Sequence, residues 1–253
     1  ALIEEFGKDM KIVYTPLHGT GEMLARRALA QAGFDSVQVV EAQATADPDF
    51  STVKSPNPES QAAFALAEEL GRKAGADVLV ATDPDADRVG VEVLQKDGSY
   101  LNLSGNQIGA IMAKYILEAH KNAGTLPENA ALCKSIVSTD LVTKIAESYG
   151  VTMFNVLTGF KFIAEKIQEF EEKHNHTYMM GFEESFGYLI KPFVRDKDAI
   201  QAVLVVAELA AYYRSRGLTL ADGIEEIYKE YGYYAEKTIS VTLSGVDGAE
   251  QIK

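Results

Sequence analysis

The segment VLVATDPDADRVG (residues 78–90) joins a short apolar run to three aspartates at alternate positions. Residues 77–82 have the apolar, β-branched character of a buried strand. Asp83, Asp85 and Asp87 follow directly, at the end of that strand where α/β proteins usually bind their ligands. Carboxylates this close repel one another, and a hard cation such as Mg²⁺ would offset the repulsion. The segment therefore predicts a buried strand that leads into a metal site.

The residues before this segment alternate between strand and helix patterns. The expected elements are strands at residues 11–16 and 36–42, helices at residues 22–32 and 61–75, and a Pro-rich and Asp-rich loop at residues 46–60. Residues 88–103 alternate apolar and polar side chains around the turn sequence KDGS, which predicts a hairpin. This order of elements is typical of a parallel sheet that carries a hairpin at its edge.

A second unit of the same rhythm begins near residue 103. Ser104 and Gln107 form a capping-box pattern ahead of an amphipathic helix. The remaining elements are strands at residues 131–137, 151–157 and 177–182, and helices that follow Thr139, Gly159, Asp198 and Thr219. We therefore predict an α/β protein of two consecutive domains, at residues 1–102 and 103–253.

Composition narrows the classes of partner. The chain of 253 residues has 47% hydrophobic residues and a net charge of −13, which disfavours nucleic acid and anionic membranes as partners. An anionic substrate would have to meet a local positive patch or a metal. The single Cys133 fits a reducing compartment, and we expect a cytoplasmic protein without a membrane-spanning segment.

Three other interpretations of the acidic segment remain. An EF-hand loop needs Gly at its sixth position and Glu at its twelfth, where this chain has Arg88 and Leu94. A phosphatase of the haloacid-dehalogenase type also places aspartates after a strand, but it has Thr or Val where Asp87 stands. A solvated acidic turn is the third interpretation. The Mg²⁺ site is the hypothesis that explains the regular spacing.

Two segments, TPLHGTG (residues 15–21) and SPNPE (55–59), resemble features of the α-D-phosphohexomutase family, and we expect them to form a structural turn and a stiff loop. Four further segments resemble motifs of the same family. They are TDPDADR (residues 82–88), which resembles the metal-binding loop; LTGFKFI (157–163), which resembles a loop of the third domain; GFEESFGY (181–188), which resembles the sugar-binding loop; and VRDKDAI (194–200), which is similar to a segment of the glucose-preferring members. In the last of these, Ala199 replaces a Gly of the family motif. The resemblance covers nearly the whole chain and implies two three-layer α/β/α domains with mixed, mostly parallel sheets, the second and third domains of the family.

The resemblance also implies roles for individual residues. Asp83, Asp85 and Asp87 would hold Mg²⁺, and Arg88 would contact the transferring phosphoryl group. Glu183 and Ser185 would bond sugar hydroxyls. The remaining candidates are Thr158 and Gly159, whose backbone would face the sugar, and Lys161, Arg195 and Lys197, which would lie near a phosphate. Taken singly, Lys161 is as well explained as a solvated lysine at a helix start.

Family members interconvert hexose 1-phosphate and hexose 6-phosphate through a phosphoserine and a hexose 1,6-bisphosphate. In the family a first domain carries the serine, followed by His and Asn, and a fourth domain clamps phosphate. No serine in this sequence is followed by His-Asn. We therefore expect a part of a longer phosphoglucomutase or phosphomannomutase, ending at the start of the link to the fourth domain and inactive by itself.

Three other functions remain as alternatives. A phosphopentomutase-like enzyme carries a similar acidic loop. A phosphatase of the dehalogenase type would use Asp83 as its nucleophile. A non-catalytic module that binds sugar phosphate would need no serine domain at all.

Overall fold

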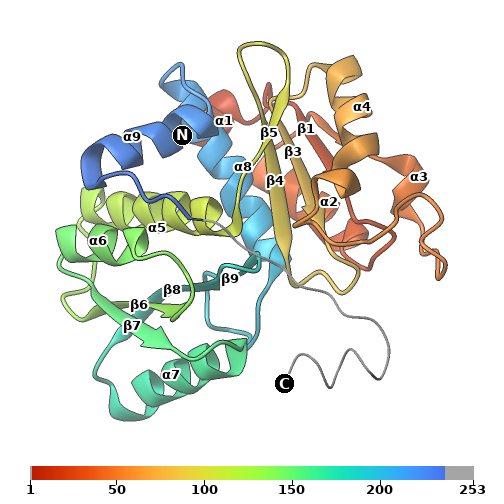
Figure 1. Cartoon of the computed structure of the whole chain (residues 1–253). Helices are drawn as coiled ribbons and strands as arrows, with labels where there is room; N and C mark the ends of the chain where they lie inside the picture. Colours follow the sequence, from red (N-terminus) through yellow and green to blue (C-terminus); the bar gives the residue numbers. More distant parts are fainter. Residues whose placement is uncertain (1, 237–253) are drawn as a thin grey trace.

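Two β-sheets lie side by side in the structure, a computed structural model that describes residues 2–236 (Figure 1). The first sheet has the order β2-β1-β3-β4-β5 and the second the order β7-β6-β8-β9. The strands are β1 (Ile12–Thr15), β2 (Val37–Val39), β3 (Val78–Thr82), β4 (Val89–Leu94), β5 (Tyr100–Asn102), β6 (Ala130–Ser135), β7 (Thr152–Val156), β8 (Thr177–Glu183) and β9 (Gly187–Leu189). Each sheet has a parallel part and an antiparallel edge. The predicted α/β class with mixed sheets is confirmed.

The helices follow most of the expected positions. They are α1 (Leu2–Phe6), α2 (Glu22–Ala32), α3 (Glu41–Ala44), α4 (Ala65–Ala74), α5 (Gly105–Asn122), α6 (Leu141–Ser148), α7 (Phe160–Lys173), α8 (Ala199–Ser215) and α9 (Leu220–Tyr231), with a 3₁₀ turn η1 (Gln61–Phe64) before α4. The sequence did not predict α1 or α3. Because α3 begins at Glu41, the strand expected at residues 36–42 is limited to β2.

Strand β3 lies in the middle of the first sheet, between β1 and β4. All five of its residues are buried, which explains the apolar run that precedes the aspartates. Leu79 and Ala81 face a cluster that includes Phe64 beside α4. Val78 and Val80 face the other way, into the large core that contains α8. Helices therefore cover both faces, and the carboxylates begin where this covered strand ends.

The hairpin predicted at residues 88–103 is confirmed. Strands β4 and β5 pair antiparallel. The turn between them is closed by a hydrogen bond of 2.8 Å from the N–H of Gln95 to the carbonyl of Ser99. Gly98 has a φ of 84°, a left-handed conformation that suits a turn glycine. The hairpin forms the outer edge of the first sheet.

Helix α7 covers one face of the second sheet, where Ile163, Ile167 and Phe170 pack with Ala131 and Cys133. Helices α5 and α6 contribute to the core on the opposite face. Cys133 is buried, as expected for a core residue.

Helix α8 belongs to both units. It contacts α1, α2, β3 and β4 of the first unit, and β9 and α5 of the second. Its sequence is apolar around most of its circumference, which is typical of a helix buried on several sides. Figure 1 shows α8 running between the two sheets. Among the described residues, no helix combines the length and the apolar character needed to cross a bilayer.

Three helices begin with side-chain caps. Ser104 and Gln107 form the predicted capping box of α5, and Thr219 and Asp222 form another at α9. Asp198 caps α8 by accepting hydrogen bonds from two backbone N–H groups. These caps satisfy N–H groups that the first helical turn leaves without partners.

Candidate functional site

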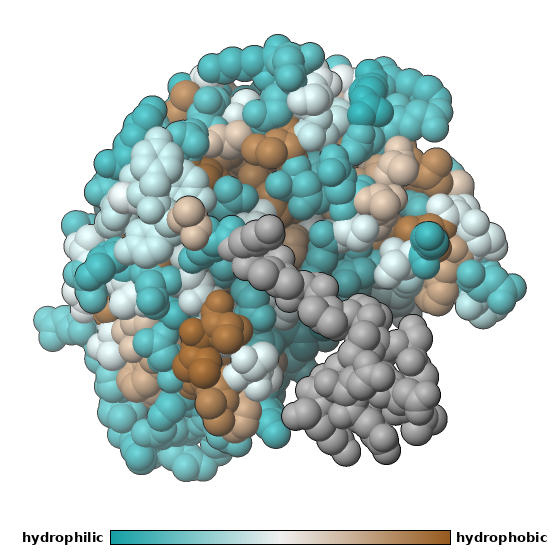
Figure 2. All heavy atoms as spheres, viewed as in Figure 1, coloured by the Kyte–Doolittle hydropathy of each residue, from teal (hydrophilic) through white to brown (hydrophobic). Residues whose placement is uncertain are grey.

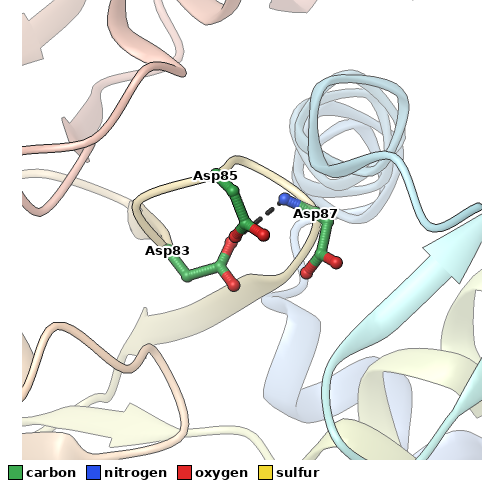
Figure 3. A group of neighbouring side chains, drawn as sticks. All are labelled: Asp83, Asp85 and Asp87. Carbon is green, nitrogen blue, oxygen red and sulfur yellow. Dashed lines mark hydrogen bonds between the residues drawn. The ribbon is translucent and has the colours of Figure 1, made fainter.

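The loop between β3 and β4 brings three carboxylates together. Asp83, Asp85 and Asp87 each offer one oxygen, and these oxygens lie within 4.8 Å of one another. Figure 3 shows that the side chains of Asp83 and Asp85 converge inside the turn. Asp83 is buried, Asp87 is half-buried and Asp85 is exposed. The group is therefore open to solvent on one side and anchored on the other.

Backbone hydrogen bonds fix the shape of this acidic loop. Oδ1 of Asp83 accepts a hydrogen bond from the N–H of Asp87 at 3.0 Å (Figure 3). The same oxygen accepts a second one from the N–H of Arg88 at 2.9 Å. Ala86 has a φ of 58°, which turns the chain so that it closes on Asp83. The loop is thus a tight turn built around its first carboxylate.

Burial raises the pKa of Asp83 to about 7. The negative charges of Asp87 and Asp85 also raise this pKa, whereas the hydrogen bond from the N–H of Arg88 lowers it. A carboxyl group with this pKa is only partly ionised at neutral pH. A divalent cation would favour its ionised form. Because the donors are all carboxylate oxygens and are already gathered, they fit a hard cation such as Mg²⁺. The loop joins two antiparallel strands instead of two helices, which excludes the EF-hand interpretation.

Arg88 lies among carboxylates. Its Nη1 donates to Glu59 at 2.8 Å, while its Nε lies 3.8 Å from Asp83 and 3.7 Å from Asp87. Its backbone forms a bridge with Gly187 of the second sheet. Glu59 was not among the predicted site residues. The sequence SPNPE predicted only a stiff loop, and the acid that follows Pro58 was the available signal for Glu59.

The loop that contains Glu59 is held down on the sheet. A Cβ at Gly90 would lie 2.4 Å from the carbonyl oxygen of Pro58, so only glycine permits this approach. The acidic loop itself is held by residues 15–21, because the N–H of Thr20 donates a 2.8 Å hydrogen bond to the carbonyl of Pro84. His18 is buried and bonds the carbonyl of Thr45 and the hydroxyl of Thr52. Residues 15–21 are therefore a structural turn that supports the acidic loop.

The second unit contributes Glu183, the last residue of β8. It is buried, and its Oε1 accepts a 2.7 Å hydrogen bond from the N–H of Gly159. This bond joins two of the predicted loops, although 24 residues separate them in the sequence. Thr158 is exposed beside it. The resemblance implied that both loops face a sugar, and the structure brings the two loops into contact.

Ser185 opens onto a polar hollow of about 740 Å³ between the two units. The hollow is lined by residues from both sides, among them Asn57, Glu59, Asn102, Asn106, Glu184 and Ser185. Asn and Glu side chains are suited to bind the hydroxyl groups of a polar ligand.

The three predicted phosphate contacts differ in position. Lys197 lies at the acidic loop, with its Nζ 2.9 Å from Oδ2 of Asp87. Arg195 is exposed and pairs with Glu171 of α7. Lys161 is exposed, with its Nζ over the ring of Phe162. Of these three cations, the structure brings only Lys197 into contact with the aspartates.

A buried polar cluster at the end of β6 was not predicted. Lys134 is 1% exposed, and its Nζ donates to the carbonyl of Ser138 at 3.0 Å. The hydroxyls of Ser135 and Ser138 both donate to the carboxylate of Glu184. A lysine inside the buried strand pattern ALCKSIV was the signal for this cluster. It fixes the residue that precedes Ser185.

An exposed apolar patch lies next to these loops. Ile136, Val137 and Leu157 are each more than half exposed, and the N–H of Ile136 bonds the carbonyl of Val156. Figure 2 shows a compact group of apolar side chains near the ends of β6 and β7, on a surface that is otherwise mainly hydrophilic. The strand ends that lead to the site therefore also carry apolar surface.

Two family models match this chain. Residues 3–96 match the model described as phosphoglucomutase/phosphomannomutase, alpha/beta/alpha domain II, and residues 104–231 match domain III of the same family. A phosphoglucomutase of Staphylococcus haemolyticus is 40% identical over 244 residues, and one of Staphylococcus aureus (strain MRSA252) is 39% identical over 245. These alignments cover 96% and 97% of this chain but 43% of each relative. The chain thus spans less than half the length of the relatives it matches.

Solved structures share the fold. A putative phosphomannomutase from Thermus thermophilus superposes with a TM-score of 0.72 at 23% identity, over 92% of this chain and 48% of that one. The phosphoglucomutase parafusin from Paramecium gives a TM-score of 0.68 at 19% identity, over 92% of this chain and 39% of that one. An Aspergillus fumigatus N-acetylphosphoglucosamine mutase, solved with GlcNAc-6P and magnesium, gives 0.60 at 15% identity, over 91% of this chain and 50% of that one.

Proposed function

The chain belongs to the phosphoglucomutase/phosphomannomutase family, and we propose that it is the central part of a mutase that interconverts hexose 1-phosphate and hexose 6-phosphate. The observation that carries this proposal is the meeting of the acidic loop with the loops of the second unit. Arg88 bridges to Gly187, and Asp87 pairs with Lys197. These two contacts support a single site to which both units would contribute residues.

Asp83, Asp85 and Asp87 would hold Mg²⁺. When bound, Mg²⁺ would draw negative charge from a transferring phosphoryl group. Arg88 would bind oxygens of that group through its guanidinium, which Glu59 holds in position. The buried Asp83 would keep the loop in shape, because two backbone N–H groups already bond its Oδ1. This engagement also makes Asp83 a poor nucleophile and weighs against the phosphatase alternative.

Glu183 and Ser185 would orient the sugar. Glu183 is already fixed through one oxygen by Gly159, and its second oxygen would accept from a sugar hydroxyl. The backbone of Thr158 and Gly159 would face the same sugar. Lys161, Arg195 and Lys197 would meet its phosphate, Arg195 after leaving Glu171.

The phosphoserine and the hexose 1,6-bisphosphate of the proposed reaction need residues from outside this sequence. We propose that flanking domains of the same polypeptide, N-terminal and C-terminal, supply the serine and a second phosphate site. The apolar patch of Ile136, Val137 and Leu157 is the surface on which we place one of these domains.

We keep the boundary between the two units at residue 103, so that they comprise residues 1–102 and 103–253. We also propose that the protein is cytoplasmic.

Isothermal titration of the metal-free chain with Mg²⁺, followed by titration with glucose 1-phosphate, tests the proposal. We expect saturable Mg²⁺ binding that is lost in the variant with Asp83→Asn, Asp85→Asn and Asp87→Asn together. Weak binding that is unchanged in this variant would refute the metal site. Mutase turnover by the isolated chain, measured with a coupled dehydrogenase, would refute the view that its site is incomplete.

A further inference from the structure

Lys197 reaches the acidic loop from the other unit. It precedes α8, and its Nζ lies 2.9 Å from Oδ2 of Asp87 and 2.9 Å from Oδ1 of Asp196. The side chain is only 14% exposed, unlike the surface lysines of α7. This is a partly desolvated ion pair between the two units, and water screens its charges less than those of a surface pair.

The stem of Lys197 runs along β9. A Cβ at Gly187 would lie 2.1 Å from its Cδ, so the stem occupies the space that any other residue at position 187 would fill. Its Nζ also lies 5.6 Å from the centre of the Phe160 ring. The ammonium is therefore held in one place by its surroundings.

The backbone beside Lys197 is fixed as well. The N–H of Asp198 bonds the carbonyl of Tyr188, and the N–H of Ala199 bonds the carbonyl of Ala86 inside the acidic loop, at 3.1 Å. The start of α8 thus carries the lysine to Asp87 on a rigid support. Arg88 lies farther from this carboxylate, at 3.7 Å, and its Nη1 is engaged by Glu59.

We propose that Lys197 is a resident counter-ion of the acidic loop, which neutralises Asp87 in the metal-free chain and competes with Mg²⁺ for that carboxylate. This inference rests on the proposed metal site. A bound divalent cation would lie close to the ammonium, and the two positive charges would repel each other. Lys197 therefore makes the metal-free loop stable and weakens Mg²⁺ binding. Its effect on the metal would be exerted through Asp87.

The test compares Mg²⁺ affinities by isothermal titration at low ionic strength, after chelator treatment. Lys197→Met keeps the length of the stem and removes the charge, Lys197→Arg keeps a charge, and Lys173→Met removes one charge from α7, where it pairs with Glu169. We expect Lys197→Met to bind Mg²⁺ about tenfold more tightly, because it removes a positive charge that would repel the cation. Lys173→Met and Lys197→Arg should stay close to the parent chain.

Thermal melting gives a second readout that needs no activity. In chelator, Lys197→Met should melt at a lower temperature than the parent, and added Mg²⁺ should raise its melting temperature by more. Gly187→Ala should act in the same direction, because its methyl group displaces the lysine stem. If Lys197→Met does not fold, Lys197→Gln replaces it in both measurements, because glutamine also lacks the positive charge.

The outcomes separate the two proposals. Weaker or unchanged Mg²⁺ binding in both Lys197→Met and Lys197→Gln, with normal binding by the parent, would overturn the counter-ion role and leave the metal site in place. A parent chain that binds no Mg²⁺ would overturn the metal site and the inference together.

Discussion

The carboxylate of Glu59 accepts a 2.8 Å hydrogen bond from Nη1 of Arg88 and thereby ties the loop at residues 46–60 to the acidic loop. The two side chains are about one-third exposed, and the guanidinium also lies near Asp83 and Asp87. The bond therefore belongs to a small charge network. Without Glu59, Arg88 would be free to fold back onto the aspartates.

Replacing Glu59 with Ala should lower the free energy of unfolding by about 1 kcal/mol, the usual size for a charge-assisted hydrogen bond that is partly shielded from water. Urea denaturation measures this change. Glu69→Ala is the matched control, because it breaks a well-exposed pair with Lys73 on α4 and should cost less than Glu59→Ala. Equal costs for the two variants would show that the Glu59 pair is an ordinary surface pair.

Glu92 should make stability depend on pH. It is fully buried in β4, and burial raises its pKa to about 7; the amide of Asn102 opposes this shift, and the negative charge of Glu68 adds to it. Between about pH 4.5 and pH 7, Glu92 therefore keeps its proton in the folded chain, whereas in the unfolded chain, where its pKa is the ordinary 4.5, it loses the proton. The contribution of Glu92 to the free energy of unfolding should therefore be most favourable below about pH 4.5. It should fall by a few kcal/mol in total as the pH rises to about 7.

Glu92→Gln should remove this contribution, because glutamine does not titrate. Urea denaturation between pH 5 and pH 8 should give a flatter profile for the variant and a gain in stability at pH 8. Some slope should persist, because Asp83 has a raised pKa of the same sign. An identical profile for the parent and the variant would contradict the role given to Glu92.

Mg²⁺ should stabilise the chain through Asp85. This side chain is exposed, so Asp85→Asn should fold normally while removing one of three carboxylates from the loop. The increase in melting temperature on adding Mg²⁺ should fall to less than half of the parent value. Asp49→Asn, which removes an exposed acid from the neighbouring loop, should keep the full increase. If both variants kept it, Mg²⁺ would be acting elsewhere.

Gly105 should tolerate no larger residue. A Cβ at this first position of α5 would lie 2.0 Å from the carbonyl oxygen of Glu184, a backbone atom that cannot move alone. Gly105→Ala should cost about 1–3 kcal/mol of unfolding free energy, as overpacked sites usually do. The same helix offers a control, since Asn122→Ala changes its exposed end and should cost less than about 0.5 kcal/mol. A neutral Gly105→Ala would mean that the loop at Glu184 yields easily.

The elements that the sequence predicted well are those specified by local pattern. Strand β3, the β4–β5 hairpin and the capping box at Ser104 each depend on neighbouring residues. The three aspartates could also be placed together, because one turn carries them all. Ser60, of a residue type common at helix N-caps, precedes the helix expected at residues 61–75, but it makes no side-chain cap hydrogen bond, and that segment begins as the 3₁₀ turn η1.

The rest of the site depends on contacts between distant residues. The pairing of Glu59 with Arg88 and that of Glu184 with Ser135 and Ser138 follow from the tertiary fold, and no periodicity in the chain reports them. The family resemblance assigned Glu183 and Gly159 to the same sugar, but it did not predict the hydrogen bond between them. Likewise, the apolar sequence of α8 is typical of a buried helix, but it does not indicate that both sheets share the helix.

This sharing has a consequence for unfolding. One continuous core contains Val78 and Val80 of the first sheet, Leu132 and Met180 of the second, and the inward side chains of α8. At its far end, α8 is tied to the first sheet by a 2.6 Å pair between Arg214 and Asp77. Neither sheet can lose α8 without exposing apolar surface of its own, so the two units should melt in a single cooperative transition.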